Sequence, residues 1–247
     1  MTHPNTSYAD KVFFEYFTYD NAKKAVILLS GFPSSYYKKE IMKFFRKKGY
    51  NVFYPRFLGN YQSKGKFLEQ DPSKTIRDFI EYLEKGTTEN LWTEEKDEFA
   101  NKKYIILSGS FSGAISFALA DHNRISRIVS FSPVWDYEQH NEDGDEEDIQ
   151  HMTDFVKRSY KHLYRFDFDN VDERMQEFNS CRYESYKDDL KHKDVTIVHD
   201  PDDEIVRIRH SRQKGDEVGA ELIEMEFGHG YSLEDLKRAN KKFENPL

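Results

Sequence analysis

The chain has 247 residues, of which 33% are charged, and its formal net charge is −8. This acidic balance argues against a general nucleic-acid binder, because such proteins neutralise phosphates with an excess of lysine and arginine. No apolar run is long enough to cross a bilayer, residues 1–11 lack the apolar core of a signal peptide, and the single cysteine, Cys181, excludes an intrachain disulfide. We therefore expect one cytoplasmic domain over residues 1–247, with neither nucleic acid nor a membrane as its partner.

Strands and helices alternate in the first part of the chain. Short apolar runs rich in β-formers predict strands at residues 12–19, 25–29 and 51–54. Apolar residues at helical spacing predict helices at residues 37–48 and 73–85. The highly charged stretch 87–103 is interpreted as an excursion at the surface.

The same alternation continues toward the C-terminus. Apolar runs predict further strands at residues 104–107, 125–131, 194–199 and 221–227. Amphipathic spacing predicts helices at residues 111–120, 205–215 and 232–243. This order predicts an α/β fold, in which a mainly parallel sheet carries helices on both faces.

Chemistry in such sheets gathers in the loops beyond the carboxyl ends of the strands. Four of these loops carry candidate groups, and they are residues 30–32, 108–112, 200–204 and 228–230. We expect these loops to meet at one rim of the sheet.

Residues 136–190 interrupt the alternation and predict an insertion in the domain. Residues 136–148 are rich in aspartate and glutamate. They lack the spacing of an EF-hand calcium loop, so a solvated acidic loop is favoured and no metal is expected. Residues 149–190 have an amphipathic helical pattern with few glycines, which indicates a small helical cap.

The turn after the strand at 104–107 is typical of a nucleophile elbow. Residues 108–113 read SGSFSG, so a strand passes into a helix over residues with very little side-chain bulk. The glycine-based register places Phe111 at the nucleophile position, whereas serine flanks allow either Ser110 or Ser112. We favour Ser110, because Ser108 then follows the apolar run directly as the first small residue. A small turn that binds an anion, or nothing, is the alternative interpretation.

A nucleophilic serine needs a base, and the base needs an acid that fixes its tautomer. His229 follows the last predicted strand between two glycines, and we choose it as the base. Residues 200–204 offer several carboxylates. Asp200 fits a turn and Asp202 fits a helix cap, so we favour Asp203 as the acid.

Two backbone amides are predicted to stabilise the negative charge that develops in such a reaction. One is the amide of Phe111, directly after Ser110, and the other is that of Phe32, in the loop after residues 25–29. Tyr36, Trp135 and Tyr137 are candidates for lining a substrate pocket, although ordinary packing explains each of them equally well.

Several motifs resemble those of α/β-hydrolases. Residues 30–33, SGFP, look like that family's H-G-F-P stretch, with Ser30 in place of histidine. Residues 49–56 and the loop after them are similar to the family's next strand and loop, and residues 55–67 look most like the prolyl-oligopeptidase and dienelactone-hydrolase branch.

The two C-terminal motifs of this resemblance carry the candidate acid and base. Residues 199–206 resemble H-G-x-x-D-x-x-V, which aligns Asp203 with the acid, and residues 228–230 match the G-H-G around the histidine. Two departures from the family pattern are serine at both elbow flanks and Asp200 in place of the glycine after His199.

The resemblance implies a serine hydrolase with Ser110, Asp203 and His229 as its triad and no cofactor. We expect an esterase acting on a small- or medium-sized acyl substrate. A peptidase or thioesterase using the same triad, or a non-catalytic binding protein of the same fold, are the alternatives. The sequence leaves open whether the chain forms a homodimer.

Overall fold

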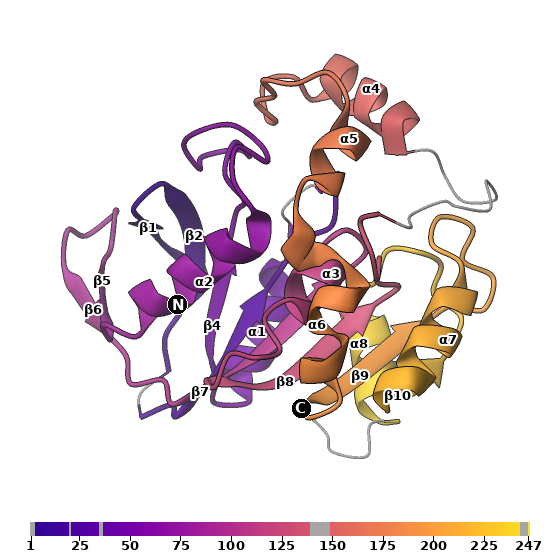
Figure 1. Ribbon diagram of the computed structural model, residues 1–247. Coiled ribbons are helices and arrows are strands. Elements are labelled where there is room, and N and C mark those ends of the chain that lie inside the picture. Colours follow the sequence, from indigo (N-terminus) through magenta and orange to yellow (C-terminus); the bar gives the residue numbers. More distant parts are fainter. Residues whose placement is uncertain (1–2, 20, 35–36, 139–148, 243–246) are drawn as a thin grey trace.

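An eight-stranded sheet forms the centre of the protein. The computed structural model describes residues 3–19, 21–34, 37–138, 149–242 and 247, with only the backbone described at 149–152. The strands follow the order β1-β2-β4-β3-β7-β8-β9-β10 (Figure 1). Neighbouring strands are parallel from β4 to β10, and β2 is antiparallel to both β1 and β4. The prediction of a mainly parallel sheet is therefore confirmed.

The strands of the sheet are short and most are apolar. Their bounds are β1 (Asn5–Ala9), β2 (Val12–Phe17), β3 (Lys24–Leu28), β4 (Asn51–Pro55), β7 (Lys103–Gly109), β8 (Ile125–Phe131), β9 (Asp194–His199) and β10 (Glu221–Glu224).

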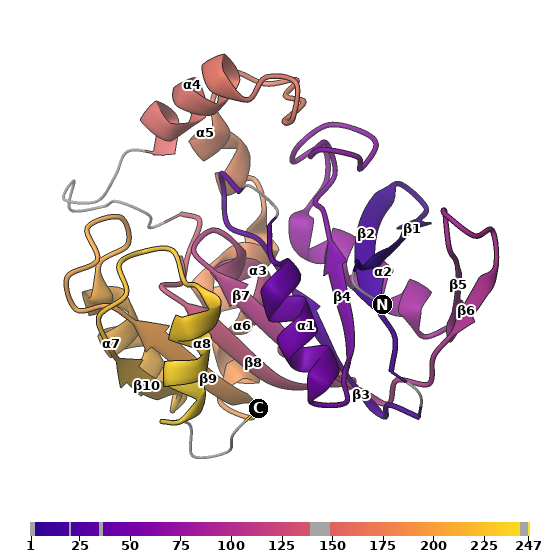
Figure 2. The same cartoon turned by 180° about the vertical axis from the view of Figure 1, so that it is seen from behind.

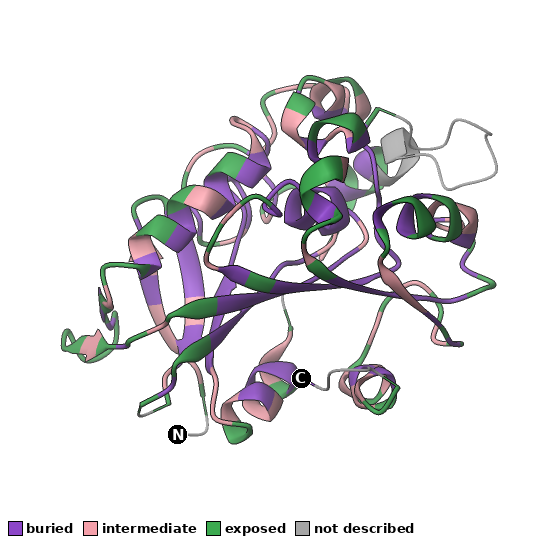
Figure 3. Ribbon diagram, turned by 60° about the horizontal axis from the view of Figure 1, so that its bottom comes forward, coloured by how far each residue is buried: buried purple, intermediate pink, exposed green. Residues whose placement is uncertain are grey.

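Helices cover both faces of the sheet, as the alternation predicts. One face carries α1 (Lys39–Lys47) and α8 (Leu233–Asn240), which lie in front of the sheet in Figure 2. The other face carries α2 (Pro72–Leu83), α3 (Ser112–Phe117), α6 (Tyr183–Leu190) and α7 (Ile208–Val218). Figure 3 shows the buried sides of these helices turned toward the sheet.

The central strand β7 shows why two helical layers are needed. Tyr104 and Ile106 point into the core under α2 and α3, whereas Ile105 and Leu107 point into the core under α1 and α8. All four side chains are buried. Because successive strand residues face opposite sides, a strand that is apolar throughout must be covered on both faces.

Two parts of the sheet structure were not predicted. β1 pairs with β2 at the sheet edge, and a separate hairpin of β5 (Thr87–Glu89) and β6 (Lys96–Glu98) lies within the predicted surface excursion. These strands are polar or very short, so they lack the apolar periodicity that marks a buried strand.

Helix α7 begins at Ile208 rather than at Ile205 as predicted. The backbone N–H groups of Ile205 and Val206 donate to the carboxylate of Asp203, at 2.9 and 3.1 Å. Residues 205–206 therefore belong to the loop after β9, where a side chain satisfies their donors.

The segment predicted as a cap is divided between two places. Helices α4 (Ile149–Ser159) and α5 (Val171–Gln176) stand away from the sheet, at the top of Figure 1. A short turn, η1 (Asn179–Cys181), and α6 pack on α3 in the layer below. Most of the predicted acidic loop, residues 139–148, lies outside the described residues. None of the helices in the described ranges is long and apolar enough to span a membrane.

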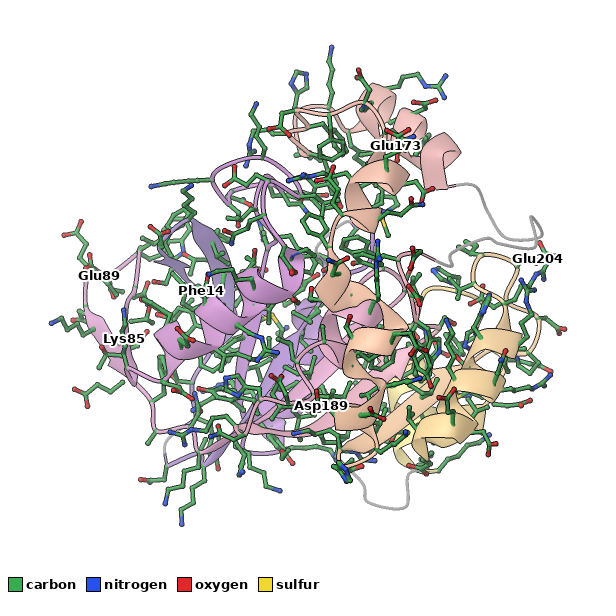
Figure 4. The ribbon with its side chains drawn as sticks, viewed as in Figure 1. Phe14, Lys85, Glu89, Glu173, Asp189 and Glu204 are labelled. Atoms are coloured by element: carbon green, nitrogen blue, oxygen red, sulfur yellow. The ribbon has the colours of Figure 1, made fainter. Side chains whose placement is uncertain are left out.

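A ring cluster joins the antiparallel edge of the sheet to α2. Phe14 of β2 lies between the sheet and α2, whereas charged side chains such as Glu173 and Asp189 lie at the surface (Figure 4). The Phe14 ring is fully buried, and its centroid lies 5.1 Å from that of Phe79 in α2.

We predict that Phe14→Ala lowers the free energy of unfolding by about 3–5 kcal/mol, because it removes a buried ring and leaves a cavity. Urea denaturation monitored by circular dichroism measures this change. Trp92→Ala is the control, since Trp92 is 78% exposed and its loss should cost less than about 1 kcal/mol. Equal losses in the two variants would contradict the described packing of β2 on α2.

Candidate active site

Ser110 occupies a strained turn between β7 and α3. Its φ is +52°, a left-handed conformation that a residue with a side chain seldom adopts. Hydrogen bonds hold it there, because its N–H donates to the carbonyl of Phe131 at 3.0 Å and its carbonyl accepts from Val134 N–H at 3.0 Å. The turn therefore presents the Ser110 side chain at the carboxyl end of the central strand.

Close packing explains the glycines of this turn. A Cβ atom on Gly109 would lie 2.9 Å from the carbonyl oxygen of Phe131, and one on Gly113 would lie 2.5 Å from Pro133 Cβ. Both positions need glycine because neighbouring backbone approaches them closely. The elbow thus depends on Gly109 and Gly113 as well as on its flanking serines.

The two flanking serines are buried and engaged within the turn. Ser108 Oγ lies 2.8 Å from both Ser116 Oγ and Ser130 Oγ. Ser112 Oγ donates to the Gly109 carbonyl at 3.0 Å and accepts from Gly109 N–H at 3.1 Å. Ser112 is fully buried, so its hydroxyl holds the turn together and does not face the pocket.

A chain of hydrogen bonds joins the three predicted residues. His229 Nε2 lies 2.8 Å from Ser110 Oγ, and His229 Nδ1 lies 2.9 Å from Asp203 Oδ2. With a carboxylate at Nδ1, the imidazole carries its proton on that nitrogen, and Nε2 accepts the hydrogen bond of the serine hydroxyl. Residues 110, 203 and 229 thus meet at one rim, as the sequence predicts.

Asp203 is fully buried and stays ionised. Its side chain accepts hydrogen bonds from the backbone of Ile205 and Val206 as well as from His229. Burial acts to raise the pKa of this carboxyl, but the hydrogen bond and charge of His229, together with the side chain of Ser132 and a hydrogen bond from the backbone of Val206, outweigh it and lower the pKa below its ordinary value. The neighbouring carboxylates Asp202 and Glu204 are exposed, and Figure 4 shows Glu204 at the surface.

Asp200 has a structural role that sequence reasoning missed. Its Oδ2 accepts hydrogen bonds from the backbone N–H groups of Phe227 and Gly228, both at 2.5 Å. Its Oδ1 accepts from Asp202 N–H at 2.9 Å. Asp200 therefore ties the loop that carries Asp203 to the loop that carries His229. Its position directly after β9 suggested only a turn former.

The loop after β3 lies against the serine. A Cβ atom on Gly31 would lie 3.3 Å from Ser110 Cβ and 3.7 Å from Ser110 Oγ. Among the described residues, neither Phe32 N–H nor Phe111 N–H donates to a backbone acceptor. The Phe32 ring stacks on Phe67 with centroids 5.0 Å apart, which anchors its backbone beside the serine.

A pocket of about 430 Å³ opens above Ser110 and His229. Its apolar walls include Leu29, Phe131 and Ile205, and it is also lined by Phe155 of α4. Within the described residues, no group of three or more histidine, cysteine, aspartate or glutamate side chains is placed to hold a metal ion.

The predicted pocket role of Trp135 and Tyr137 needs correction. Both rings are buried in the core and do not line the pocket. Trp135 Nε1 donates to Ser211 Oγ at 2.9 Å, and Tyr137 OH donates to the Phe111 carbonyl at 3.0 Å. Each ring thus packs as a core aromatic whose polar atom has a partner. The third candidate, Tyr36, lies outside the described residues.

Comparisons with known proteins show the fold. No family model and no curated protein sequence matches the chain. Among solved structures, the Pyrococcus furiosus esterase Pf2001 is 16% identical, with a TM-score of 0.63 over 97% of this chain and 87% of that one. A structure from a study of carboxylesterases of Nitrososphaera gargenis is 16% identical, with a TM-score of 0.62 over 92% and 91%.

A third similar structure is described as an alpha/beta hydrolase. It is MGS-MChE2, an alpha/beta hydrolase enzyme from the metagenome of lagoon sediments at Mar Chica, Morocco. It is 13% identical and has a TM-score of 0.60 over 93% of this chain and 92% of that one. The chain therefore has the α/β-hydrolase fold. Its placement in the prolyl-oligopeptidase and dienelactone-hydrolase branch stays a prediction.

We predict that Asp200→Ala lowers the free energy of unfolding by about 1–3 kcal/mol at pH 7, since the backbone N–H groups of Asp202, Phe227 and Gly228 lose their hydrogen bonds to a charged acceptor. Burial acts to raise the pKa of Asp200, but its backbone donors outweigh burial and lower it. Its contribution is therefore complete above the ordinary carboxyl pKa of about 4 and disappears as the pH falls through the lowered value.

Urea denaturation of the wild type and of Asp200→Ala at several pH values measures this effect. The difference between them should be constant near neutrality and shrink in acid. Asp202→Ala is the matched control, because Asp202 is exposed and its removal should change little. A difference that persists unchanged at the acid end would contradict the proposed role of the carboxylate charge.

Proposed function

We propose that the protein is a serine hydrolase that cleaves carboxylic esters through an acyl-enzyme intermediate. One observation carries this proposal: Ser110, His229 and Asp203 form a continuous hydrogen-bonded chain at the floor of a pocket, with the serine on a strained turn. Serine, base and acid in this order of contact make up the arrangement that activates a hydroxyl for acyl transfer.

Acylation begins with removal of the Ser110 proton by His229. As Nε2 takes the proton, Oγ attacks the carbonyl carbon of the ester and the carbonyl oxygen becomes negatively charged. The N–H groups of Phe32 and Phe111, which lack backbone acceptors in the described structure, are the proposed donors to this oxygen. His229 then returns the proton to the departing alcohol, and the acyl group stays on Ser110.

Deacylation repeats these steps with water in place of the serine hydroxyl. His229 takes a proton from water, the resulting hydroxide attacks the acyl carbon, and Ser110 Oγ leaves with that proton. The ester supplies the acyl group and the alcohol, water supplies the hydroxyl of the released acid, and Ser110 and His229 are regenerated at the end of the cycle.

Asp203 acts through His229. Its buried carboxylate holds the Nδ1 proton and stabilises the imidazolium that forms when Nε2 is protonated. Since the pKa of Asp203 is lowered below its ordinary value, its carboxylate remains ionised near neutral pH.

The preference for esters rests on the pocket and on the similar structures. The pocket has apolar walls and a volume suited to a small- or medium-sized acyl chain. Two of the similar structures come from an esterase and from a study of carboxylesterases. Their identities are low, so they support this proposal through the shared fold.

We expect a fluorophosphonate probe to label the wild type covalently and to leave Ser110→Ala unlabelled. The probe reacts with an activated serine hydroxyl, and this substitution removes the hydroxyl. Ser112→Ala is the matched control and should still be labelled, since Ser112 is buried within the turn. Fluorescence of the denatured protein on a gel is the measurement. An unlabelled wild type would favour a non-catalytic binding protein, and loss of labelling only in Ser112→Ala would move the nucleophile to that residue.

We also predict that Asp203→Asn lowers kcat/KM for 4-nitrophenyl hexanoate by about 10³–10⁴-fold, because a neutral amide does not stabilise the imidazolium and its NH2 group can donate to Nδ1, which favours the wrong tautomer. Initial rates of nitrophenolate release give this ratio. Asp202→Asn removes an exposed neighbouring carboxylate and should stay within about twofold of the wild type. A loss in Asp203→Asn as small as that control would show that Asp203 has no part in the reaction.

A further inference from the structure

Lys38 lies in the same pocket as the proposed nucleophile. It directly precedes α1 and, with Ser110 and His229, lines the pocket. Its Nζ donates to the carbonyl of Tyr231 at 3.2 Å and lies 4.0 Å from the centroid of the Tyr231 ring. Tyr231 is two residues beyond His229, so the ammonium group is held against the loop that carries the base.

The Tyr231 ring connects this lysine to the nucleophile turn. The ring stacks on Phe131 with centroids 4.2 Å apart. Its Cε1 atom also lies 3.3 Å from the position that a Cβ on Gly109 would take. The lysine is therefore fixed on a wall built from the ends of β7 and β8, within the pocket that Ser110 and His229 also line.

No carboxylate neutralises this charge in the described part of the chain. Lys38 forms none of the ion pairs found there, and the described residues lining the pocket include no aspartate or glutamate. By contrast, Lys43 of α1 pairs with Glu40 at 2.8 Å. A half-buried cation without a counter-ion is costly unless a ligand supplies the opposite charge.

Because Lys38 is partly buried, its side chain changes protonation state closer to neutral pH than an exposed lysine does. Removal from water lowers the pKa of its ammonium group to about 8. The other titratable side chains among the described pocket residues are Tyr37, His229 and Tyr231. None of them is a carboxylate, so the described lining of the pocket has one cation and no acidic side chain of that kind.

We propose that Lys38 determines the substrate class by binding a negatively charged group of the substrate. The inference rests on the proposed function and narrows it to esters that carry an anionic group in the acyl or the alcohol part. The apolar walls then hold the uncharged chain between that group and the reacting carbonyl. Lys38 is a specificity residue in this scheme, and it takes no part in the transfer of protons at Ser110.

Two pairs of esters separate the two positions of the charge. In the acyl part, the mono-4-nitrophenyl ester of adipic acid is compared with 4-nitrophenyl hexanoate, which has the same chain length and leaving group. In the alcohol part, 4-carboxyphenyl hexanoate is compared with phenyl hexanoate. The readout is the ratio of kcat/KM for the anionic ester to kcat/KM for the neutral one, each corrected for the rate without enzyme.

We expect this ratio to exceed one for at least one pair and to fall about tenfold in Lys38→Met, the order produced by loss of one charge-assisted hydrogen bond. Lys43→Met is the matched control, because it removes a nearby lysine of α1 that lies outside the pocket lining and should keep the ratio. A purely structural role for Lys38 would change both esters of a pair equally and leave the ratio unaltered.

The pH dependence gives a second test that needs no variant to fold. In the wild type the ratio should be high below pH 8 and fall as the pH rises through about 8, because the ammonium group then loses its proton. Proton-transfer steps at Ser110 are common to both esters of a pair and cancel from the ratio. Lys38→Arg should keep its preference above pH 9, since a guanidinium stays charged there.

Two failures can be told apart. If none of the four esters is hydrolysed in a Ser110-dependent manner, the proposed function is wrong and this inference falls with it. If the neutral esters are hydrolysed but the ratio is near one for both pairs, or is the same in Lys38→Met as in the wild type, only the role of Lys38 is overturned.

Discussion

The left-handed backbone at Ser110 is the constraint on which the site depends. A strand that must become a helix within a few residues has to pass one residue through this conformation, at a cost of about 1–3 kcal/mol. The carbonyl of Phe131 and the N–H of Val134 hold the backbone there. Gly109 and Gly113 allow the chain around it to approach that closely. The serine is thereby placed where loops from β3, β9 and β10 reach it.

Two neighbouring carboxylates, Asp200 and Asp203, position the loop and the imidazole of the histidine. Asp200 holds the loop of residues 227–228, and Asp203 holds the imidazole of His229. Burial acts to raise the pKa of both carboxyls, but backbone N–H groups lower the pKa of Asp200, and the hydrogen bond and charge of His229 are the main causes that lower the pKa of Asp203. A single turn after β9 therefore fixes both the position of the histidine and its tautomer.

The residues of the site could be predicted because the sheet imposes their convergence. Ser110, Asp203 and His229 each follow a parallel strand, and parallel strands end at one rim. The sequence did not predict the surroundings of side chains whose hydrogen-bond partners come from distant segments. Trp135 was a candidate for the pocket wall, but its indole N–H donates to Ser211 in the core. Asp200 resembled an ordinary turn residue, but it accepts a hydrogen bond from the backbone of Phe227. The sequence did not single out Lys38 among the lysines in and around α1. Its contact with the Tyr231 ring, which only the folded chain shows, distinguishes it from them.

Covalent chemistry at Ser110 is tested most directly by trapping the intermediate. Rapid mixing with 4-nitrophenyl hexanoate, acid quenching within the first turnover and peptide mass spectrometry locate any acyl group on the chain. The expected result is a hexanoyl group on the peptide that contains Ser110, formed together with a burst of nitrophenolate. Turnover accompanied by a stoichiometric acyl group on another residue, or by none at all, would contradict the assignment of Ser110 as the nucleophile.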